Sequence, residues 1–392
     1  MSAKRIAIVY GGNRYWGGIE TYLLNLFKYA DKKRIDLVLI SLGEWELTKK
    51  LGAQGAEFKV FSGKRFRPRT IFEISRYLKD NNFSLIVSGG IVPNAYARAV
   101  SFFSKIPSLV IVHSEAAFEY SNPIVRFFYL LSDRLFRWPT KKYITVSEYL
   151  KKQQIKKGIP EEKITVIYNG IEASQIPNDT RLPDGQESQM TNKNQKSKIK
   201  NQEFIKVGSI GGLQPIKGYK NLIQAAKFLD QNILIEIAGE GKEESGLKKL
   251  IEDLDLKDKV KLLGFVPAEK FYPNIDIYIQ PSFSEGFSLT VAQAMSAGKP
   301  VIVTPAGALP ELVEDGKTGV ITKDTSPESL AKKIKMLISD EDLCKKIGDS
   351  AAIQAREKYN INKWAEKVTD AFLETCLPAI DSEAQARGAG KP

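Results

Sequence analysis

The sequence predicts an α/β protein built from two doubly wound parallel-sheet domains. Short apolar runs alternate along the chain with segments whose apolar residues recur at helical spacing, the pattern of strands and helices that follow one another in a parallel sheet. The chain has 392 residues, 43% hydrophobic and 27% charged, and this length suits two domains of about 150–200 residues each. A polar stretch at 173–203, rich in Asn, Gln, Lys and Ser, separates the two halves as a linker or insertion.

The charge balance is basic, because 58 Lys and Arg residues outnumber 46 Asp and Glu residues and give a net charge of +12. This balance predicts an anionic partner: a nucleic acid, an acidic lipid or a phosphorylated small molecule. The sequence carries no zinc-finger spacing, aromatic RNA-binding strand motif or basic zipper, so we expect no nucleic-acid partner.

The start of the chain and its cysteines predict a cytoplasmic protein. The first five residues lead directly into an apolar strand, so no signal peptide is expected. No apolar run reaches the ~18 residues that a membrane-spanning helix needs. Cys344 and Cys376 lie in charged helical sequence, where reduced thiols are expected rather than a disulfide.

The first half of the chain reads as one doubly wound domain. Its helical patterns begin near Ile19 and cover 70–79 and 95–103. Its apolar runs predict strands at 4–10, 36–41, 57–61, 84–88, 108–112, 142–147 and 163–167.

A glycine-rich turn at 11–18 follows the first strand. It resembles a dinucleotide-binding fingerprint only loosely, because the glycine spacing differs and no acidic residue ends the strand at 36–41. A dehydrogenase is therefore not expected. At the least, Gly17 and Gly18 form a tight strand-to-helix turn.

His113 is the only histidine of the chain and comes directly after the strand predicted at 108–112. Ligands of open parallel sheets bind at the carboxyl ends of strands. The position therefore favours ligand binding by His113 over a purely structural role.

The second half begins with a strand at 204–210, a glycine-rich turn that contains Lys217, and a helix at 219–229. A strand at 275–280, a loop, a helix at 288–297 and a strand at 301–303 follow later; further strands are predicted at 233–238 and 259–263.

The segment at 281–300 organises this second half. It places Glu285, Gly286 and the first amides of the helix at the carboxyl end of a strand. Free amides at a helix start favour an anion such as a phosphate. We therefore expect a phosphate-bearing ligand at this loop.

These motifs together resemble the retaining glycosyltransferases of family 4, whose GT-B fold consists of two Rossmann-like domains around a cleft. The resemblance runs from Lys4 to about Leu377. The Gly-Gly-x-Glu motif is present at Gly17-Gly18-Ile19-Glu20, and Lys217 fits the Lys of G-R-L-x-x-x-K-G. The signature E-G-F-G-L…E-A-M-A…G-x-P-V is matched by Glu285, Gly286, Phe287, Leu289, Ala294, Met295, Gly298, Pro300 and Val301.

The resemblance implies the following site. Glu285, His113 and Lys217 would be the catalytic residues, with Lys217 on the donor diphosphate and His113 on the donor sugar. No metal ion and no cofactor are expected, since the nucleoside diphosphate sugar is a substrate. The donor-binding residues would be Gly17, Gly18, Gly212, Gly239, Val266, Gly286, Phe287, Ser288, Leu289, Thr290 and Gln293.

Two positions depart from the family pattern. Gly212 stands where the family has an Arg, which removes a fork-shaped phosphate contact. Gln293 stands where the second Glu of the signature accepts hydrogen bonds from the ribose, so it keeps one acceptor oxygen and loses the charge. Weaker donor binding is expected.

The predicted organisation is an acceptor-side domain at 1–172, the linker at 173–203, a donor-binding domain at 204–359, a helix at 360–377 that crosses back to the first domain, and a tail at 378–392.

The predicted function is retaining transfer of a sugar from a nucleoside diphosphate donor to a hydroxyl acceptor, saccharide or lipid-linked, in polysaccharide or glycolipid synthesis. Two alternatives stay open: a degenerate, non-catalytic carbohydrate- or partner-binding protein, and a sugar-nucleotide epimerase of the same fold. An aromatic and basic helix expected at 123–138 is interpreted as a core or interdomain helix, or as one that rests on an anionic membrane at the inner face of the plasma membrane.

Overall fold

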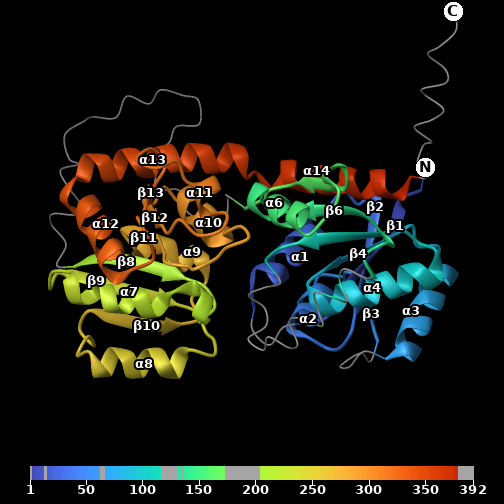
Figure 1. Cartoon of the computed structure of the whole chain (residues 1–392), viewed down its shortest axis with the longest axis horizontal. Helices are drawn as coiled ribbons and strands as arrows, with labels where there is room; N and C mark the ends of the chain where they lie inside the picture. Colours follow the sequence, from blue (N-terminus) through green and yellow to red (C-terminus); the bar gives the residue numbers. More distant parts are fainter. Residues whose placement is uncertain are drawn as a thin grey trace, which may run out of the picture.

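The computed structural model describes residues 2–12, 16–61, 67–115, 131, 133, 136–172 and 204–377. Two parallel sheets lie side by side along the long axis of the molecule, each with its own helices (Figure 1). Most of the helix predicted at 123–138, the linker at 173–203 and the tail at 378–392 lie outside the described residues. The prediction of two Rossmann-like parallel-sheet domains is confirmed.

The first sheet has seven parallel strands in the order β3-β2-β1-β4-β5-β6-β7. Its strand order reverses between β1 and β4, which makes this pair the switch point of the sheet. The strands are β1 (Lys4–Tyr10), β2 (Ile35–Ser41), β3 (Phe58–Val60), β4 (Leu85–Gly89), β5 (Ser108–Val112), β6 (Thr140–Thr145) and β7 (Ile164–Val166).

Helices cover both faces of this sheet because its strands are apolar on both sides. In β1, Ile6 and Ile8 face the cluster that contains α1, while Ala7 and Val9 face the cluster that contains α3 and α4. The helices are α1 (Gly18–Tyr29), α2 (Glu46–Ala53), α3 (Pro68–Asp80), α4 (Ile91–Ser104) and α6 (Glu148–Lys156).

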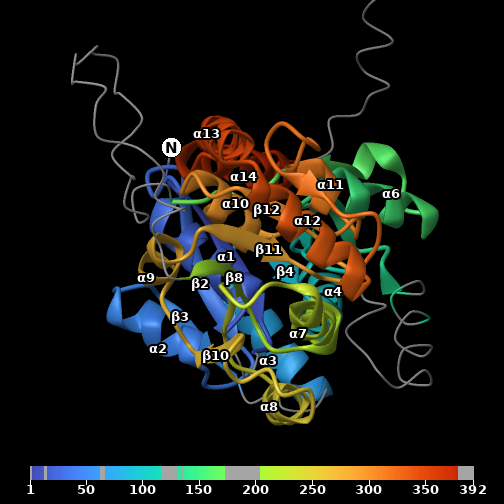
Figure 2. The same ribbon diagram turned by 90° about the vertical axis from the view of Figure 1, so that its left-hand side faces the viewer.

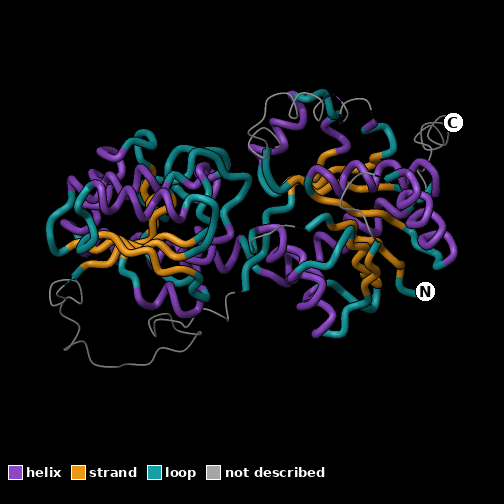
Figure 3. The backbone as a smooth tube through the Cα atoms, turned by 90° about the horizontal axis from the view of Figure 1, so that it is seen from below, coloured by secondary structure: helices purple, strands orange, loops and turns teal. Residues whose placement is uncertain are grey.

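The second sheet has six parallel strands in the order β10-β9-β8-β11-β12-β13, with its switch point between β8 and β11. Helices again lie above and below the strands (Figure 3). The strands are β8 (Ile205–Ile210), β9 (Ile233–Ala238), β10 (Val260–Gly264), β11 (Ile277–Gln280), β12 (Val301–Val303) and β13 (Val320–Ile321).

The helices of this half are α7 (Tyr219–Ala225), α8 (Glu244–Asp253), α9 (Ala268–Phe271), α10 (Leu289–Ser296), α11 (Leu309–Leu312), α12 (Pro327–Ser339), α13 (Glu341–Lys358) and α14 (Ile361–Cys376). A short 3₁₀ turn, Pro215–Lys217, precedes α7. Figure 2 views the molecule from the six-stranded side, with α7 and α8 towards the viewer and α13 and α14 along the top.

α14 belongs to the first domain although it ends the described chain. It lies along the seven-stranded sheet, where it contacts α1, β4 and β5 (Figure 1). The rings of Tyr22 and Trp364 meet edge to face at 4.9 Å. Ile171, near the end of the first described half, lies beside the junction of α13 and α14, because its amide donates to the Tyr359 carbonyl at 2.8 Å.

Candidate active site

The centre of the candidate site is the switch point of the six-stranded sheet, where the loops after β8 and β11 meet. Gly218 has φ of +69°, and a Cβ added there would lie 2.0 Å from the Pro281 carbonyl oxygen. Only glycine allows this contact at that backbone angle. The approach places Lys217, one residue earlier, against the loop that carries Glu285.

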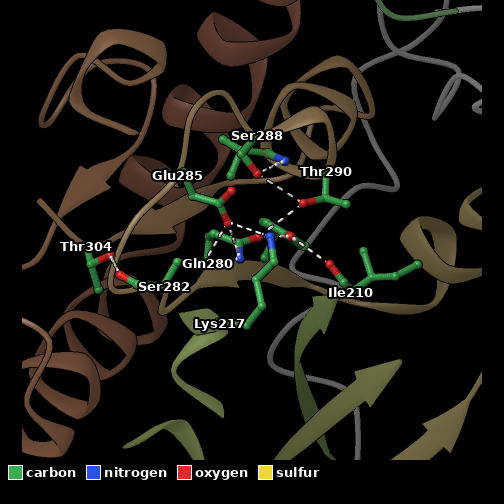
Figure 4. Close-up of polar contacts among 10 residues, drawn as sticks. Ile210, Lys217, Gln280, Ser282, Glu285, Ser288, Thr290 and Thr304 are labelled. Carbon is green, nitrogen blue, oxygen red and sulfur yellow. Dashed lines mark hydrogen bonds and ion pairs between the residues drawn. The ribbon is translucent and has the colours of Figure 1, made fainter. Parts of the chain in front are cut away.

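Glu285 and Lys217 form an ion pair at this point. Lys217 Nζ lies 2.8 Å from Glu285 Oε1, with the lysine side chain 24% and the glutamate side chain 8% exposed. Ser282 Oγ donates to the same oxygen at 2.8 Å and Gln280 Nε2 donates to it at 3.2 Å. Figure 4 shows these contacts converging on one oxygen of the carboxylate. Three donors therefore fix the position of Oε1.

Gln280 orients this network from the end of β11, where its side chain is completely buried. Its Oε1 accepts from the Tyr278 hydroxyl at 2.6 Å and from Thr290 Oγ1 at 3.1 Å. With the oxygen so occupied, the amide nitrogen must face Ser282 and Glu285. Burial raises the pKa of Tyr278, which keeps its hydroxyl protonated as a donor.

The backbone of Glu285 is held from the loop after β12. The Ala308 amide donates to the Glu285 carbonyl at 2.9 Å. Gly307 has φ of +58°, and a Cβ there would lie 2.2 Å from the same oxygen. Within the described chain no side chain donates to Glu285 Oε2, so one carboxylate oxygen is left for a ligand.

The first turn of α10 supplies further polar groups beside Glu285. Ser288 caps the helix by accepting from the Val291 amide at 3.4 Å, and its Oγ lies 3.1 Å from Thr290 Oγ1 (Figure 4). Gln293 Oε1 accepts from the Tyr272 hydroxyl at 3.3 Å. Leu289, Thr290 and Gln293 are partly exposed, so the start of the helix faces solvent as an anion site requires.

The loops after β8 and β9 lie beside this centre. A Cβ on Gly239, whose φ is +138°, would lie 2.0 Å from the Gly211 carbonyl oxygen, so these loops pack backbone to backbone. A Cβ on Gly212 would meet nothing closer than 3.6 Å, so the missing arginine leaves open space. Val266, after β10, is partly exposed.

Phe287 occupies a different place from its neighbours in the same motif. Its side chain is buried, with ring centroids 5.3 Å from Tyr359 and 6.2 Å from Tyr168. Its ring therefore contributes to the packing where the two domains join, and any contact with the donor would come from its backbone.

On the opposite side of the cleft, Gly17 and Gly18 begin α1. The Gly17 amide donates to Glu20 Oε2 at 2.9 Å, and the Tyr10 hydroxyl donates to Glu20 Oε1 at 2.8 Å. Glu20 is thus the capping residue of its own helix, which explains the Gly-Gly-x-Glu spacing structurally. Nothing lies within 4 Å of a Cβ built on Gly18.

His113 follows β5 and packs edge to face against Tyr22, with ring centroids 4.6 Å apart. Burial lowers the pKa of His113 to about 4, so the ring is neutral at physiological pH. A cavity of ≈ 50 Å³ adjoins the ring and is also lined by Asn94 and by the ion pair of Arg98 and Asp133. This volume admits a few water molecules and no sugar ring.

The structure brings the two halves of the predicted site together at one contact. A Cβ on Gly286 would lie 2.1 Å from the His113 carbonyl oxygen, so the loop of Glu285 touches the end of β5 across the domain boundary. Lys217, Glu285, Ser288 and Thr290 lie on one side of this contact. His113 lies on the other.

Sequence reasoning missed several residues of the site. Gln280 and Ser282 are completely buried polar residues beside the apolar run of β11, and this interruption is the signal that could have found them. The pair formed by Tyr149 and Glu115 lies at the domain boundary and has no comparable signal.

Metal binding and membrane spanning are two further properties on which the described residues bear. In the described ranges, no group of three or more His, Cys, Asp or Glu side chains is arranged to hold a metal ion. Among the described helices, none has the length and apolar character needed to cross a membrane.

Comparison with known proteins identifies the family. Residues 16–175 match the glycosyltransferase family 4 domain, and residues 190–354 match the glycosyl transferases group 1 domain. A glycosyltransferase of Methanocaldococcus jannaschii is 29% identical over 65% of this chain and 64% of its own length. A second one from that organism is 30% identical over 69% of each chain.

Solved structures share the fold. Anabaena HepE, solved in complex with UDP and glucose, superposes with a TM-score of 0.78 over 93% of this chain and 98% of its own, at 20% identity. This structural likeness shows the fold alone. The sequence matches show the family. The chain belongs to the family 4 glycosyltransferases and has their GT-B fold.

Proposed function

We propose that the protein transfers a sugar, with retention of configuration, from a nucleoside diphosphate sugar to a hydroxyl acceptor in the synthesis of a polysaccharide or glycolipid. The observation that carries this proposal is the ion pair of Lys217 and Glu285 at the switch point, 2.8 Å apart and beside the first turn of α10. A cation and free helix amides at one point suit a diphosphate.

In the proposed reaction the bond between the anomeric carbon and the diphosphate oxygen breaks. A bond from the acceptor oxygen to that carbon forms on the same face of the sugar, and the acceptor proton passes to the departing diphosphate. Lys217 and the amides of α10 would stabilise the negative charge that develops on the leaving group. Closure of the cleft would exclude water, which would otherwise compete with the acceptor.

His113 would contact the donor sugar as a neutral ring, because its lowered pKa keeps it uncharged. The donor-binding residues Gly239 and Val266 would form the pocket for the nucleobase of the donor, as the family resemblance implies. HepE, a fold relative, is described in complex with UDP and glucose, so uridine nucleotides are the first donors to test.

The two departures from the family pattern would weaken donor binding without abolishing it. Gly212 lacks the guanidinium, and Lys217 is left as the cation on the loop after β8. Gln293 keeps an acceptor oxygen beside the Tyr272 hydroxyl. We propose that the transfer needs no metal ion, because Lys217 and the helix amides neutralise the diphosphate; the rate should then survive EDTA.

We further propose that the acceptor is presented at an anionic membrane on the cytoplasmic side. An aromatic patch on the first domain supports this. It consists of Phe72, Phe102, Phe103 and Trp138, which are 54%, 41%, 42% and 64% exposed. Their rings form a chain of contacts at 4.8, 5.0 and 5.2 Å.

Cations surround this patch. Lys105 Nζ lies 5.0 Å above the Phe102 ring, and Lys79 Nζ donates to the Phe103 carbonyl at 3.0 Å. Arg76 is exposed four residues after Phe72 on α3. Exposed aromatic rings with basic neighbours suit the headgroup region of an anionic bilayer.

Vesicle sedimentation tests the membrane proposal. The protein should bind phosphatidylglycerol vesicles, should ignore neutral phosphatidylcholine vesicles, and should dissociate as salt screens the charges. Trp138→Ser with Phe102→Ser should abolish binding, while Phe228→Ser, also an exposed aromatic (43%) but on the other domain, should not. Equal binding of both lipids, or binding by the double variant, removes the proposal.

A thermal-shift series with UDP, GDP, ADP, dTDP and CMP tests the donor site. A ligand at about 100 times its Kd stabilises the protein by roughly 2.7 kcal/mol, which shifts Tm by a few degrees. One nucleotide should give this shift in wild type and lose it in Lys217→Ala. No shift with any nucleotide would favour the non-catalytic alternative, and donor turnover without acceptor would favour the epimerase.

A further inference from the structure

Glu311 makes its side-chain contacts across the domain boundary. It lies on α11 of the six-stranded domain, and its carboxylate accepts from the amides of Glu148 at 2.9 Å and Tyr149 at 2.5 Å. These are the first two residues of α6 in the other domain. The Tyr168 hydroxyl donates to the same carboxylate at 3.1 Å.

This contact has the chemistry of a strong helix cap. The first amides of a helix have no partner within the helix and carry its positive dipole end. The side chain of Ser147, the N-cap residue, accepts from the Leu150 amide, at 3.2 Å. Glu311 therefore supplies both acceptors for the first two amides, with one charged oxygen on each.

The same short segment holds the loop of Glu285. Ala308, three residues before Glu311, donates its amide to the Glu285 carbonyl, and Gly307 packs against that oxygen. The segment 307–311 thus contacts the candidate catalytic loop at one end and the other domain at its other end.

Tyr149 makes a second link at the same place. Its hydroxyl donates to Glu115, two residues after His113, and lies beside the side chain of Ser284, directly before Glu285. Burial, followed by the hydrogen bond to Glu115, raises the pKa of Tyr149 to about 12, so the hydroxyl stays protonated at neutral pH. The residue capped by Glu311 therefore contacts both sides of the cleft.

We infer that Glu311 is a positioning residue: by capping α6 it holds the two domains in the arrangement in which Glu285 and His113 share one cleft. This inference rests on the proposed function for its effect on rate. Glu311 has no contact with Lys217, Gln280 or the start of α10 among the described contacts. Its loss should therefore slow the transfer and leave nucleotide binding in place.

The test compares Glu311→Ala and Glu311→Gln with Glu314→Ala, a nearby exposed glutamate that pairs only with Lys317 in the described part. Amide hydrogen exchange at 148–149 should accelerate about tenfold or more in Glu311→Ala. The kcat should fall about tenfold or more while the Kd for the nucleotide stays within about threefold. Glu311→Gln should be intermediate, because it keeps one acceptor oxygen.

A second variant tests the inference even if Glu311→Ala fails to fold. Tyr149→Phe keeps the cap and removes only the hydroxyl link, so kcat should fall with exchange at 148–149 unchanged. Unchanged exchange in Glu311→Ala overturns the inference, and so does accelerated exchange with unchanged kcat. If wild type turns over no sugar nucleotide, the proposed function falls, and the exchange result alone then decides whether Glu311 holds the domains together.

Discussion

The two sheets reverse their strand order in the same way, yet their switch points differ in chemistry. Between β8 and β11 lie the ion pair of Lys217 with Glu285 and two further hydrogen-bond donors that converge on Glu285 Oε1. The switch point between β1 and β4 is instead lined by glycines, at 11, 12, 17, 18, 89 and 90. His113 lies nearby, where its ring packs edge to face against another aromatic ring. One fold thus provides one switch point with prearranged polar side chains and one that glycines line, where Gly18 and Gly90 adjoin open space.

The difference suits the two substrates of a transferase. A diphosphate has the same charge whichever sugar it carries, so fixed polar groups can be prearranged for it. An acceptor varies from one enzyme to another, and an open glycine-lined surface leaves room for that variation. The fold therefore determines where ligands bind, and the side chains at each switch point determine what binds there.

The largest effect should come from breaking the polar switch point. Lys217→Ala removes the cation beside Glu285, and kcat should fall about 10²–10³-fold, as for the loss of one preorganised charge-stabilising group. Lys220→Ala is the matched control, since that lysine forms a surface ion pair with Glu243 at 2.8 Å. Equal activity of the two variants would remove Lys217 from the proposed mechanism.

The switch point between β1 and β4 should affect how the stability of the protein depends on pH. The pKa of His113 is about 4 in the folded protein, below its ordinary value of 6.5. Between these values the unfolded chain binds the proton more readily, so stability is complete above pH 6.5 and declines towards pH 4. Lowering the pH from 7.5 to 4.5 should cost wild type about 2–3 kcal/mol more than His113→Gln.

Urea unfolding of both proteins at the two pH values measures this difference. Because other groups titrate in both proteins, only the difference between their pH dependences reports on His113. Parallel pH profiles would mean that His113 is protonated as easily in the folded state as in the unfolded chain.

The smallest effect should distinguish the glycines of the two regions. Gly218→Ala places a Cβ against the Pro281 carbonyl at a positive φ, so the free energy of unfolding should drop by about 1–3 kcal/mol. Gly18→Ala enters open space at the start of α1 and should change stability by less than about 0.5 kcal/mol. Chemical denaturation of both variants makes the comparison, and equal losses would contradict it.

The fold was largely predictable because parallel strands are buried on both faces. Runs such as 108–112, 233–238 and 301–303 contain little besides apolar residues, and the strands observed there have the predicted bounds. The helices α2, α6 and α8 were not predicted. α6 is mostly polar, with only Leu150 and Gln154 buried, so periodicity gives almost no sign of it.

Only those site residues that belong to a sequence motif could be predicted. Glu285 and Lys217 belong to such motifs, and the structure places them 2.8 Å apart, although their roles in the reaction stay predictions. The bonds of Glu311, by contrast, depend on residues that the tertiary fold brings together. A carboxylate that caps a helix of another domain has no local sequence signal, because its partner lies 163 residues away.

The position of α14 has a consequence for how the protein is made. The first domain lacks one of its covering helices until residues 361–376 have been synthesised, since Trp364, Val368 and Phe372 belong to its core cluster. On the ribosome, the seven-stranded sheet must therefore wait, without α14 on that face, while the whole six-stranded domain is translated. A nascent chain in this state exposes an apolar surface to which chaperones can bind. Packing of α14 covers that surface and ends chaperone binding.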